Sequence, residues 1–259
     1  MARAEGWPLY GRAGFEVDAQ MSDFGITTAL QYSGGRDSRA ILHMYRDQLD
    51  KIIVVWFDAG DSYPEVVRDM HRLAAQIPHF LILRGQVSRE IEQHGYPSDV
   101  VPINATIFGR QFVKTAGPLI QSTYDCCSRS IWQPLYQAMK LLGIKKIIRG
   151  QRNDEEHTNP HCRDGIVIDG IEYVLPLETW SEAQVETYLR ENHIKIPEHY
   201  ASELESHDCM HCTGYLARNV NRIRNLPPGP YAEVQKRLRE IAVVIDRESA
   251  PLHTAIGMP

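Results

Sequence analysis

The most constraining feature of the sequence is a glycine pair that separates an apolar run from a helical one. The segment from Ile26 to Tyr45 reads ITTALQYSGGRDSRAILHMY. Residues before Ser33 predict a short strand, and the apolar spacing after Gly35 predicts a helix. Two glycines let the chain turn tightly and bring backbone N–H groups close to a ligand. A strand, a tight turn and a helix in this order favour an α/β fold.

The same alternation continues along the chain. Further strands are predicted at 51–60, 79–85 and 144–151, and further helices at 64–77, 128–143 and 181–193. A hairpin is predicted at 166–177, with Asp169 and Gly170 at its turn. Segment 86–123 has no strong period and is expected to hold loops and short helices. The pattern predicts a Rossmann-like α/β domain with a parallel sheet, whose ligands bind beyond the carboxyl ends of the strands.

Three segments are expected: an irregular arm at 1–22, a nucleotide-binding domain at 23–213 and a helical C-terminal extension at 214–259. The extension should hold a helix near 214–224, a break at LPPGP and an amphipathic helix ending near Asp246. We interpret its cations as a solvated helix face, with a nucleic-acid contact as the alternative. These cations are Arg218, Arg222, Arg224, Lys236, Arg237 and Arg239.

Composition limits the class of protein. The chain has 259 residues, of which 43% are hydrophobic and 24% charged, as in soluble globular proteins. No apolar run is long enough to span a bilayer, and the first residues lack the apolar core of a secretory signal. We therefore expect a cytoplasmic protein with no membrane contact. We also expect it to form a homo-oligomer. The net charge of -5 gives no overall support for nucleic-acid binding.

The turn after the first predicted strand has the composition of a phosphate-binding loop. The residues that would cradle the anion are Ser33, Gly34, Gly35, Arg36, Asp37 and Ser38. The glycines expose N–H groups, the serines add hydroxyl donors, and the following helix directs its positive end at the loop. The arginine adds a positive charge, and the aspartate could help to hold Mg²⁺. An ordinary strand-to-helix turn would explain a bare Ser-Gly-Gly but not the whole hexapeptide.

SGGxDS is the signature of the PP-loop ATP pyrophosphatases, and this chain resembles them, with Arg36 where the family usually has Lys. The resemblance implies an adenine-nucleotide α-hydrolase-like fold that binds ATP and Mg²⁺ and cleaves ATP between its α- and β-phosphates. A second segment, VVWFDAGDSYPEV, resembles the DTGxxFPET segment of the PAPS reductase branch. By that resemblance, Asp58 and Gly60 lie beside the nucleotide.

A third segment, IIRGQRNDEE, resembles the xxGxRxxxS segment of the same family. It implies that Arg152 contacts phosphate or sulfate. We therefore expect Arg36, Asp37 and Arg152 to be the catalytic residues.

Two pairs of cysteines need a separate explanation. One pair is adjacent in TYDCCSRSIW and the other lies in DCMHC, and together they are Cys126, Cys127, Cys209 and Cys212. Adjacent cysteines rarely form a disulfide, because the ring would be strained. In a reducing compartment, metal binding is the better explanation. Four thiolates could hold one Zn²⁺ or a 4Fe-4S cluster, and adjacent cysteines suit the cluster better because its iron atoms lie at separate corners.

The segment CCSRSIWQPLYQAM resembles CCxxRKxxPLxxAL of the assimilatory APS reductases, and the stretch VLPLETWSEAQVETYLRENHIKIPEHY resembles the one before their second cysteine pair. The resemblance covers about Thr27 to Cys212 and implies a 4Fe-4S cluster on the four cysteines. Two features differ from the reductases. Ser130 and Ile131 replace an Arg-Lys pair, and no cysteine follows Cys212, whereas the reductases attack with a cysteine in a C-terminal tail. With the intact SGGxDS loop, these differences favour ATP cleavage.

The sequence therefore predicts an iron–sulfur ATP pyrophosphatase that adenylates an acceptor for sulfur transfer. The acceptor could be tRNA, DNA or a small molecule, and a sulfur donor or reductant protein would be a partner. The alternatives are an APS or PAPS reductase that produces sulfite, and a non-catalytic nucleotide-binding iron–sulfur subunit. Cys162 is interpreted as a free loop thiol, with a sulfur carrier as the alternative. We expect Trp56 and Trp180 to pack in the core, and His211 could bond towards the cluster.

Overall fold

The computed structural model describes residues 25–155, 162–195 and 208–258, and the predicted arm at 1–22 lies outside them. A six-stranded sheet has the order β3–β2–β1–β6–β8–β7. Its strands are β1 (Thr28–Gln31), β2 (Ile53–Asp58), β3 (Phe80–Arg84), β6 (Lys146–Ile148), β7 (Val167–Ile168) and β8 (Ile171–Val174). All neighbours are parallel except β7 and β8. The predicted parallel α/β sheet is confirmed.

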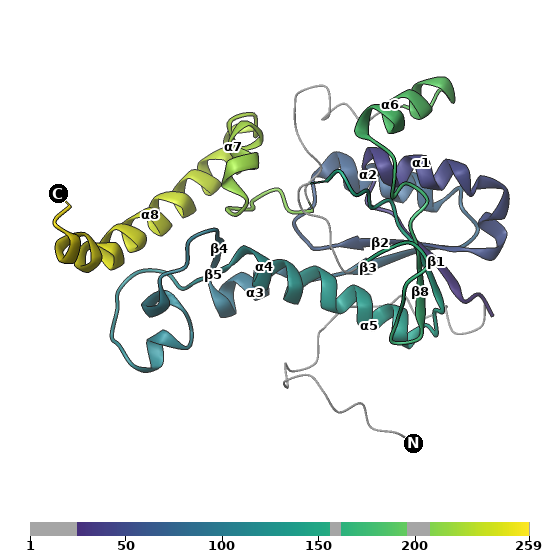
Figure 1. The fold of residues 1–259 in the computed structure, drawn as a ribbon. Helices are drawn as coiled ribbons and strands as arrows, with labels where there is room; N and C mark the ends of the chain where they lie inside the picture. Colours follow the sequence, from purple (N-terminus) through teal and green to yellow (C-terminus); the bar gives the residue numbers. More distant parts are fainter. Residues whose placement is uncertain (1–24, 156–161, 196–207, 259) are drawn as a thin grey trace, which may run out of the picture.

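Helices cover both faces of this sheet (Figure 1). One face carries α1 (Arg36–Met44), α2 (Pro64–Ala74) and α6 (Glu182–Glu191), and the other carries α3 (Val87–His94), α4 (Thr123–Cys127) and α5 (Gln133–Leu141). Alternate residues of β2 supply the two cores, since Val54 and Trp56 face α1 whereas Val55 and Phe57 face α5. Trp56 and Trp180 pack in the first of these cores, as expected.

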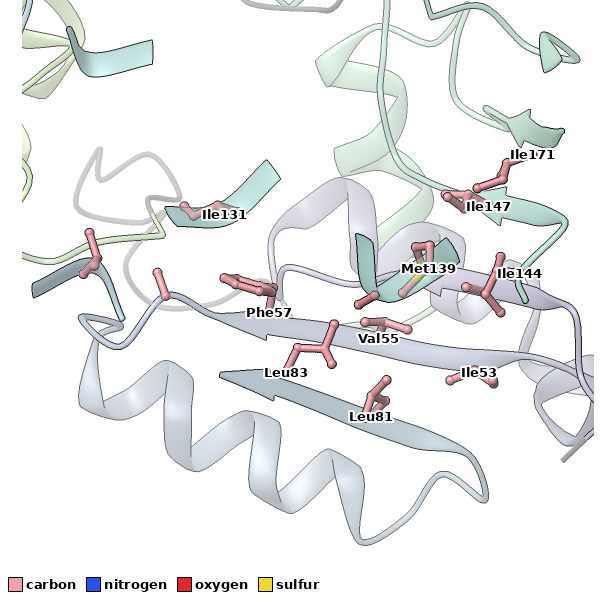
Figure 2. Close-up of a cluster of buried hydrophobic side chains, with 14 of the residues drawn as sticks. Ile53, Val55, Phe57, Leu81, Leu83, Ile131, Met139, Ile144, Ile147 and Ile171 are labelled. Carbon is pink, nitrogen blue, oxygen red and sulfur yellow. The ribbon is translucent and has the colours of Figure 1, made fainter. Parts of the chain in front are cut away.

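Figure 2 shows the second core, in which strand residues Val55, Phe57 and Leu83 gather beneath Met139 of α5. Met139 is fully buried. Burial of each such side chain contributes about 1.5–3 kcal/mol. This packing fixes the helical segment 123–141, which carries the adjacent cysteines, against the sheet.

The hairpin formed by β7 and β8 is confirmed. Asp169 has φ 49° and Gly170 has φ 78°, so both central residues lie in the left-handed region that a two-residue hairpin turn requires. The Tyr136 hydroxyl donates to Asp169 Oδ2 at 2.5 Å and Lys140 Nζ donates to the Asp169 carbonyl at 3.0 Å. The hairpin is thereby bonded to α5.

Segment 86–123 was expected to hold only loops and short helices, and this was incomplete. Besides short helices, it contains the parallel strands β4 (Tyr96–Ser98) and β5 (Ile120–Ser122). Three-residue strands are too short to show a period of two. Ile120 packs against Ile241 and Val244 of the C-terminal helix. The pair is therefore stabilised by a segment far away in the sequence.

The C-terminal part holds α7 (Leu216–Arg224) and α8 (Pro228–Ile256). The predicted break at LPPGP is confirmed, since residues 225–227 separate the two helices. Pro228 already belongs to α8 as its first residue, where its missing N–H costs nothing. The helix also continues past Asp246 to Gly257, a left-handed C-cap with φ 73°. Figure 1 shows α8 extending away from the main sheet over β4 and β5. The boundary at residue 213 stays a prediction.

Candidate functional site

A cleft of about 360 Å³ lies at the carboxyl ends of β1, β2 and β6. Strand β1 lies between β2 and β6 in the sheet. The connection after β1 leads to β2 on one side of it, whereas β6, which comes later in the sequence, lies on the other side. Ligands of open α/β sheets bind at this kind of switch point. Of the predicted site residues, the cleft lining includes Ser33, Gly35, Asp37 and Ser38.

The glycine loop, residues 33–38, forms the N-terminal end of α1. Gly34 has φ 85°, and a Cβ there would lie 2.5 Å from Met70 Cε, so a side chain would be strained. Gly35 is the N-cap of α1 and makes no side-chain cap. The first N–H groups of a helix have no partner within it, which suits them to bind an anion. The Ser38 hydroxyl orders the turn by donating to the Gly35 carbonyl at 2.9 Å.

Arg152 joins the glycine loop to the loop after β6. Its guanidinium binds the Asp37 carboxylate, and its Nε donates to Asp154 Oδ1 at 2.8 Å. Arg152 is only 6% exposed. Burial raises the pKa of Asp37, although the nearby Arg152 opposes that shift. Burial and the Asp37 charge also raise the pKa of Glu155, which lines the cleft.

Arg36 lies in a different place from the one its predicted role requires. Its guanidinium lies 2.5 Å from the carboxylates of both Glu182 and Glu186 on α6. The side chain therefore ties α1 to α6, and among the described residues it does not belong to the cleft lining. The Arg36 backbone N–H stays in the first turn of α1, at the mouth of the loop.

Asp58 and Gly60 shape the turn after β2. Asp58 Oδ1 accepts bonds from the Gly60 N–H at 2.9 Å and from the Ser62 hydroxyl at 2.8 Å. Gly60 has φ 87°, and a Cβ there would lie 3.0 Å from the Gly85 carbonyl oxygen. Neither residue lines the cleft as the structure describes it. They fix the conformation of its neighbouring loop.

The four predicted metal ligands come from two distant segments. Cys126 and Cys127 lie on α4, Cys209 and Cys212 lie in the loop before α7, and all four thiols are free. Burial, with a smaller contribution from Cys212, raises the pKa of Cys126 and Cys127 to about 12. Burial and Cys212 also raise the pKa of Cys209. The Tyr215 hydroxyl donates to Cys127 Sγ at 3.7 Å, which places the loop before α7 beside α4. We name residues 208–215 the cysteine loop.

The four cysteines remain the candidate ligands of a metal site. Within 25–155, 162–195 and 208–258, no group of three or more His, Cys, Asp or Glu side chains could hold a metal ion. A single Zn²⁺ would need its sulfurs about 2.3 Å from a common centre. A 4Fe-4S cluster takes each thiolate at a different iron atom, so a set of four cysteines, two of them adjacent, suits it chemically.

A π-helical turn, η4 (Ser128–Trp132), follows the adjacent cysteines, a feature that the sequence analysis missed. Pro134 lacks the N–H that would continue the regular α-helical bonding, and the Ser130 hydroxyl donates to the Cys126 carbonyl at 2.6 Å. The wider turn places Trp132 in the cleft lining, where it is 48% exposed. Pro134 is the sequence feature that could have indicated this π-helical turn.

The interpretation of the C-terminal cations as a solvated face is wrong for Arg222. This residue is 2% exposed, and its guanidinium donates to the Met210 carbonyl at 2.8 Å and the Cys212 carbonyl at 3.0 Å. It also donates to the Tyr63 hydroxyl at 2.9 Å. The spacing of Asn219, Arg222 and Ile223, the buried residues of α7, was the available signal.

Cys162 does not have the environment of a sulfur carrier. It is 2% exposed, and burial raises its pKa despite the nearby Arg149. A reactive thiol needs access and a lowered pKa. The structure therefore favours the interpretation as a free thiol. Arg149 itself lines the cleft and adds a cation that the sequence analysis did not single out.

A model of the phosphoadenosine phosphosulfate (PAPS) reductase domain matches residues 27–215. The chain belongs to the PAPS reductase domain family. No curated protein matches the chain closely enough to count as a relative.

Three solved structures resemble this family member. A PAPS reductase from Candida auris, in a phosphate complex, is 17% identical with a TM-score of 0.47, covering 70% of this chain and 79% of its own. An NH3-dependent NAD synthetase from Campylobacter jejuni is 14% identical with a TM-score of 0.39, covering 87% of each chain. The U34-tRNA thiolase NcsA from Methanococcus maripaludis, with its 4Fe-4S cluster, is 12% identical with a TM-score of 0.41, covering 85% and 72%. Similarities this low support no argument about activity.

Proposed function

We propose that this family member is an iron–sulfur PP-loop ATP pyrophosphatase. The observation that supports the proposal most is the uncapped start of α1 at the cleft, within an intact SGGRDS loop. A triphosphate matches this arrangement, because helix-terminal N–H groups, hydroxyls and the cation Arg149 face one cleft. ATP would also bring a base to the exposed face of Trp132.

Each predicted residue has a defined part in this proposal. The backbone N–H groups at 36–38 and the hydroxyls of Ser33 and Ser38 would bind phosphate oxygens. Asp37 would hold Mg²⁺, while Arg152 keeps the Asp37 carboxylate in position. Gly34 and Gly35 give the turn its shape, and Asp58 and Gly60 support it from the next loop.

An acceptor oxygen would attack the α-phosphorus of ATP, and the bond from that phosphorus to the bridging oxygen would break. Pyrophosphate leaves with the electron pair, and AMP stays on the acceptor. Mg²⁺ bound at Asp37 would offset negative charge in this step. The α1 N–H groups and Arg149 would stabilise the charge that develops on the leaving group.

The four cysteines would hold the cluster, which supplies electron transfer or a site for sulfur when bound. Their donor set supports a 4Fe-4S cluster over one Zn²⁺, because adjacent cysteines can each bind a different iron atom. The adenylated acceptor would be tRNA, DNA or a small molecule, and sulfur or electrons would come from a partner protein. The proposed enzyme would act as a homo-oligomer.

The test uses protein purified without oxygen. Iron, sulfide and zinc are assayed, and Mg-ATP is then added and pyrophosphate release is measured. About four irons per chain and steady pyrophosphate release support the proposal. Asp37→Asn should lower release at least about tenfold, because Asp37 is proposed to hold Mg²⁺, whereas the matched control Asp47→Asn should not. Asp47 is 84% exposed on its side chain. Zinc without iron contradicts the cluster, and an inert iron protein contradicts ATP cleavage.

Sulfonucleotide reduction is the second candidate, and the PAPS reductase domain match favours it. Sulfite release from PAPS or APS with reduced thioredoxin would replace the main proposal if Mg-ATP released no pyrophosphate. Tight ATP binding with neither product would indicate the non-catalytic nucleotide-binding subunit.

A further inference from the structure

The loop after β2 is bonded directly to the cysteine loop through one residue. The Asp61 carbonyl accepts from the Met210 N–H at 2.7 Å. Its carboxylate accepts from the His211 N–H at 2.9 Å and lies 2.6 Å from His211 Nδ1. Asp61 therefore bonds both residues that separate Cys209 from Cys212. His211 bonds to Asp61, and no bond from His211 to a thiol is present among the described residues.

The position of Asp61 is fixed relative to the cleft. The turn that presents it is closed by the two bonds to Asp58 and by Gly60, which an ordinary residue could replace only with strain. The preceding strand, β2, lines the cleft through Val55, Trp56 and Phe57. Movement of the cleft wall and movement of Asp61 are therefore linked through a short, rigid segment.

The cysteine loop also reaches the cleft at its other end. Asp208 lines the cleft, and its carbonyl lies 3.4 Å from the Ser62 hydroxyl. Arg222 bonds the far side of the same loop to Tyr63. The segment 61–63 consequently meets the cysteine loop at three places, and Asp61 makes the most bonds.

We propose that Asp61 is a positioning residue that couples nucleotide binding in the cleft to the order of the cysteine loop. A bound nucleotide restricts the cleft wall at β2 and Asp208, and Asp61 transmits that restriction to Met210 and His211. Coupling of this kind is reciprocal, so an ordered cysteine loop raises the affinity for the nucleotide by the same factor. The proposal rests on the proposed function, because the ligand is taken to be Mg-ATP.

Hydrogen–deuterium exchange of the full chain tests this coupling with Mg-ATP as the probe. Two peptides are followed, one covering 33–39 and one covering 208–215. In wild-type protein, Mg-ATP should slow exchange in both peptides. In Asp61→Ala, exchange of the cysteine loop should be about tenfold faster without ligand, as expected when hydrogen bonds to a charged group are lost. Mg-ATP should then protect only residues 33–39.

The decisive readout is the response to nucleotide. If Asp61 were merely structural, the cysteine loop would exchange faster in Asp61→Ala, yet Mg-ATP would still slow it by the wild-type factor. That result would overturn the proposal. Asp61→Asn, which keeps one acceptor oxygen, should restore part of the response and serves if the alanine variant does not fold. Asp47→Ala is the charge-matched control and should behave as wild type.

Failure of this proposal differs from failure of the proposed function. Protection of 33–39 without any change in 208–215 overturns the coupling alone. No protection of 33–39 in wild-type protein overturns nucleotide binding and this proposal with it. The Kd for Mg-ATP gives a second readout, since it should rise in Asp61→Ala by the factor lost in cysteine-loop protection.

Discussion

The backbone turn of the glycine loop and the cysteine loop are stabilised in different ways, although the Asp37 side chain in the glycine loop also binds the distant Arg152. Bonds within the glycine loop join near neighbours, such as Ser38 to Gly35, three residues apart, and Arg39 to Gly34, five residues apart. The cysteine loop is bonded to residues far along the chain, since Arg222 lies 159 residues from Tyr63 and His211 lies 150 residues from Asp61. Local substitutions should therefore have small effects in the first loop and large ones in the second.

The largest effect is expected from removal of a cysteine, because a site built from two segments fails when either loses a ligand. Cys127→Ser and Cys212→Ser should each lose most of the bound iron and the visible absorbance, compared with about four irons per chain in wild-type protein. The measurement is iron and sulfide content after anaerobic purification. Cys162→Ala is the control, since that thiol is buried outside the set. Equal iron loss in the control would show that the ligand set is wrong.

Arg222→Met should have the next largest effect, on stability. The substitution leaves two partly buried carbonyls and the Tyr63 hydroxyl without their donor, and each lost partner costs about 1–3 kcal/mol. We expect the free energy of unfolding in urea to fall by about 3 kcal/mol or more. Arg224→Met, on the exposed face of the same helix, should change it by less than about 0.5 kcal/mol. Similar losses in both variants would contradict a special role for Arg222.

The contrast between local and long-range contacts also explains which parts of the fold could be predicted from the sequence. The strand, glycine turn and helix were readable because their pattern and turn chemistry are local, and the hairpin at Asp169 and Gly170 was readable for the same reason. The three-residue strands β4 and β5 were not, because α8 covers them from a distant part of the chain.

Within the site, the sequence predicted which residue types gather but not where each side chain points. Arg36 was expected at the phosphates, yet α6 offers it two carboxylates that no local pattern could assign to it. Arg222 looked like one of several surface cations, and only the tertiary packing shows that it holds the cysteine loop. The residues Asp61 and Arg149 carried no motif of their own.

Arg36→Ala distinguishes the two roles of that side chain. If the guanidinium serves only to join α1 and α6, stability should fall by about 1 kcal/mol, because both glutamates are partly exposed. Pyrophosphate release should then keep its KM for ATP within about threefold, which is less than 1 kcal/mol of binding. A rise in KM of tenfold or more would return the side chain to the phosphates. Arg46→Ala, at an exposed arginine, is the control for lost charge.

The smallest effect is expected from Ser38→Ala, and it tests whether the glycine loop is locally stabilised. The Gly35 carbonyl keeps its bond from the Arg39 N–H at 3.0 Å, so loss of the Ser38 hydroxyl should cost only about 0.5 kcal/mol. Hydrogen exchange should rise in a peptide covering 33–39 and stay unchanged in the cysteine loop. Ser33→Ala, whose hydroxyl lies a longer 3.4 Å from the Ser38 hydroxyl, should change stability less. Faster exchange in the cysteine loop after Ser38→Ala would mean that the glycine loop also depends on long-range contacts, so the contrast between the two loops would not hold.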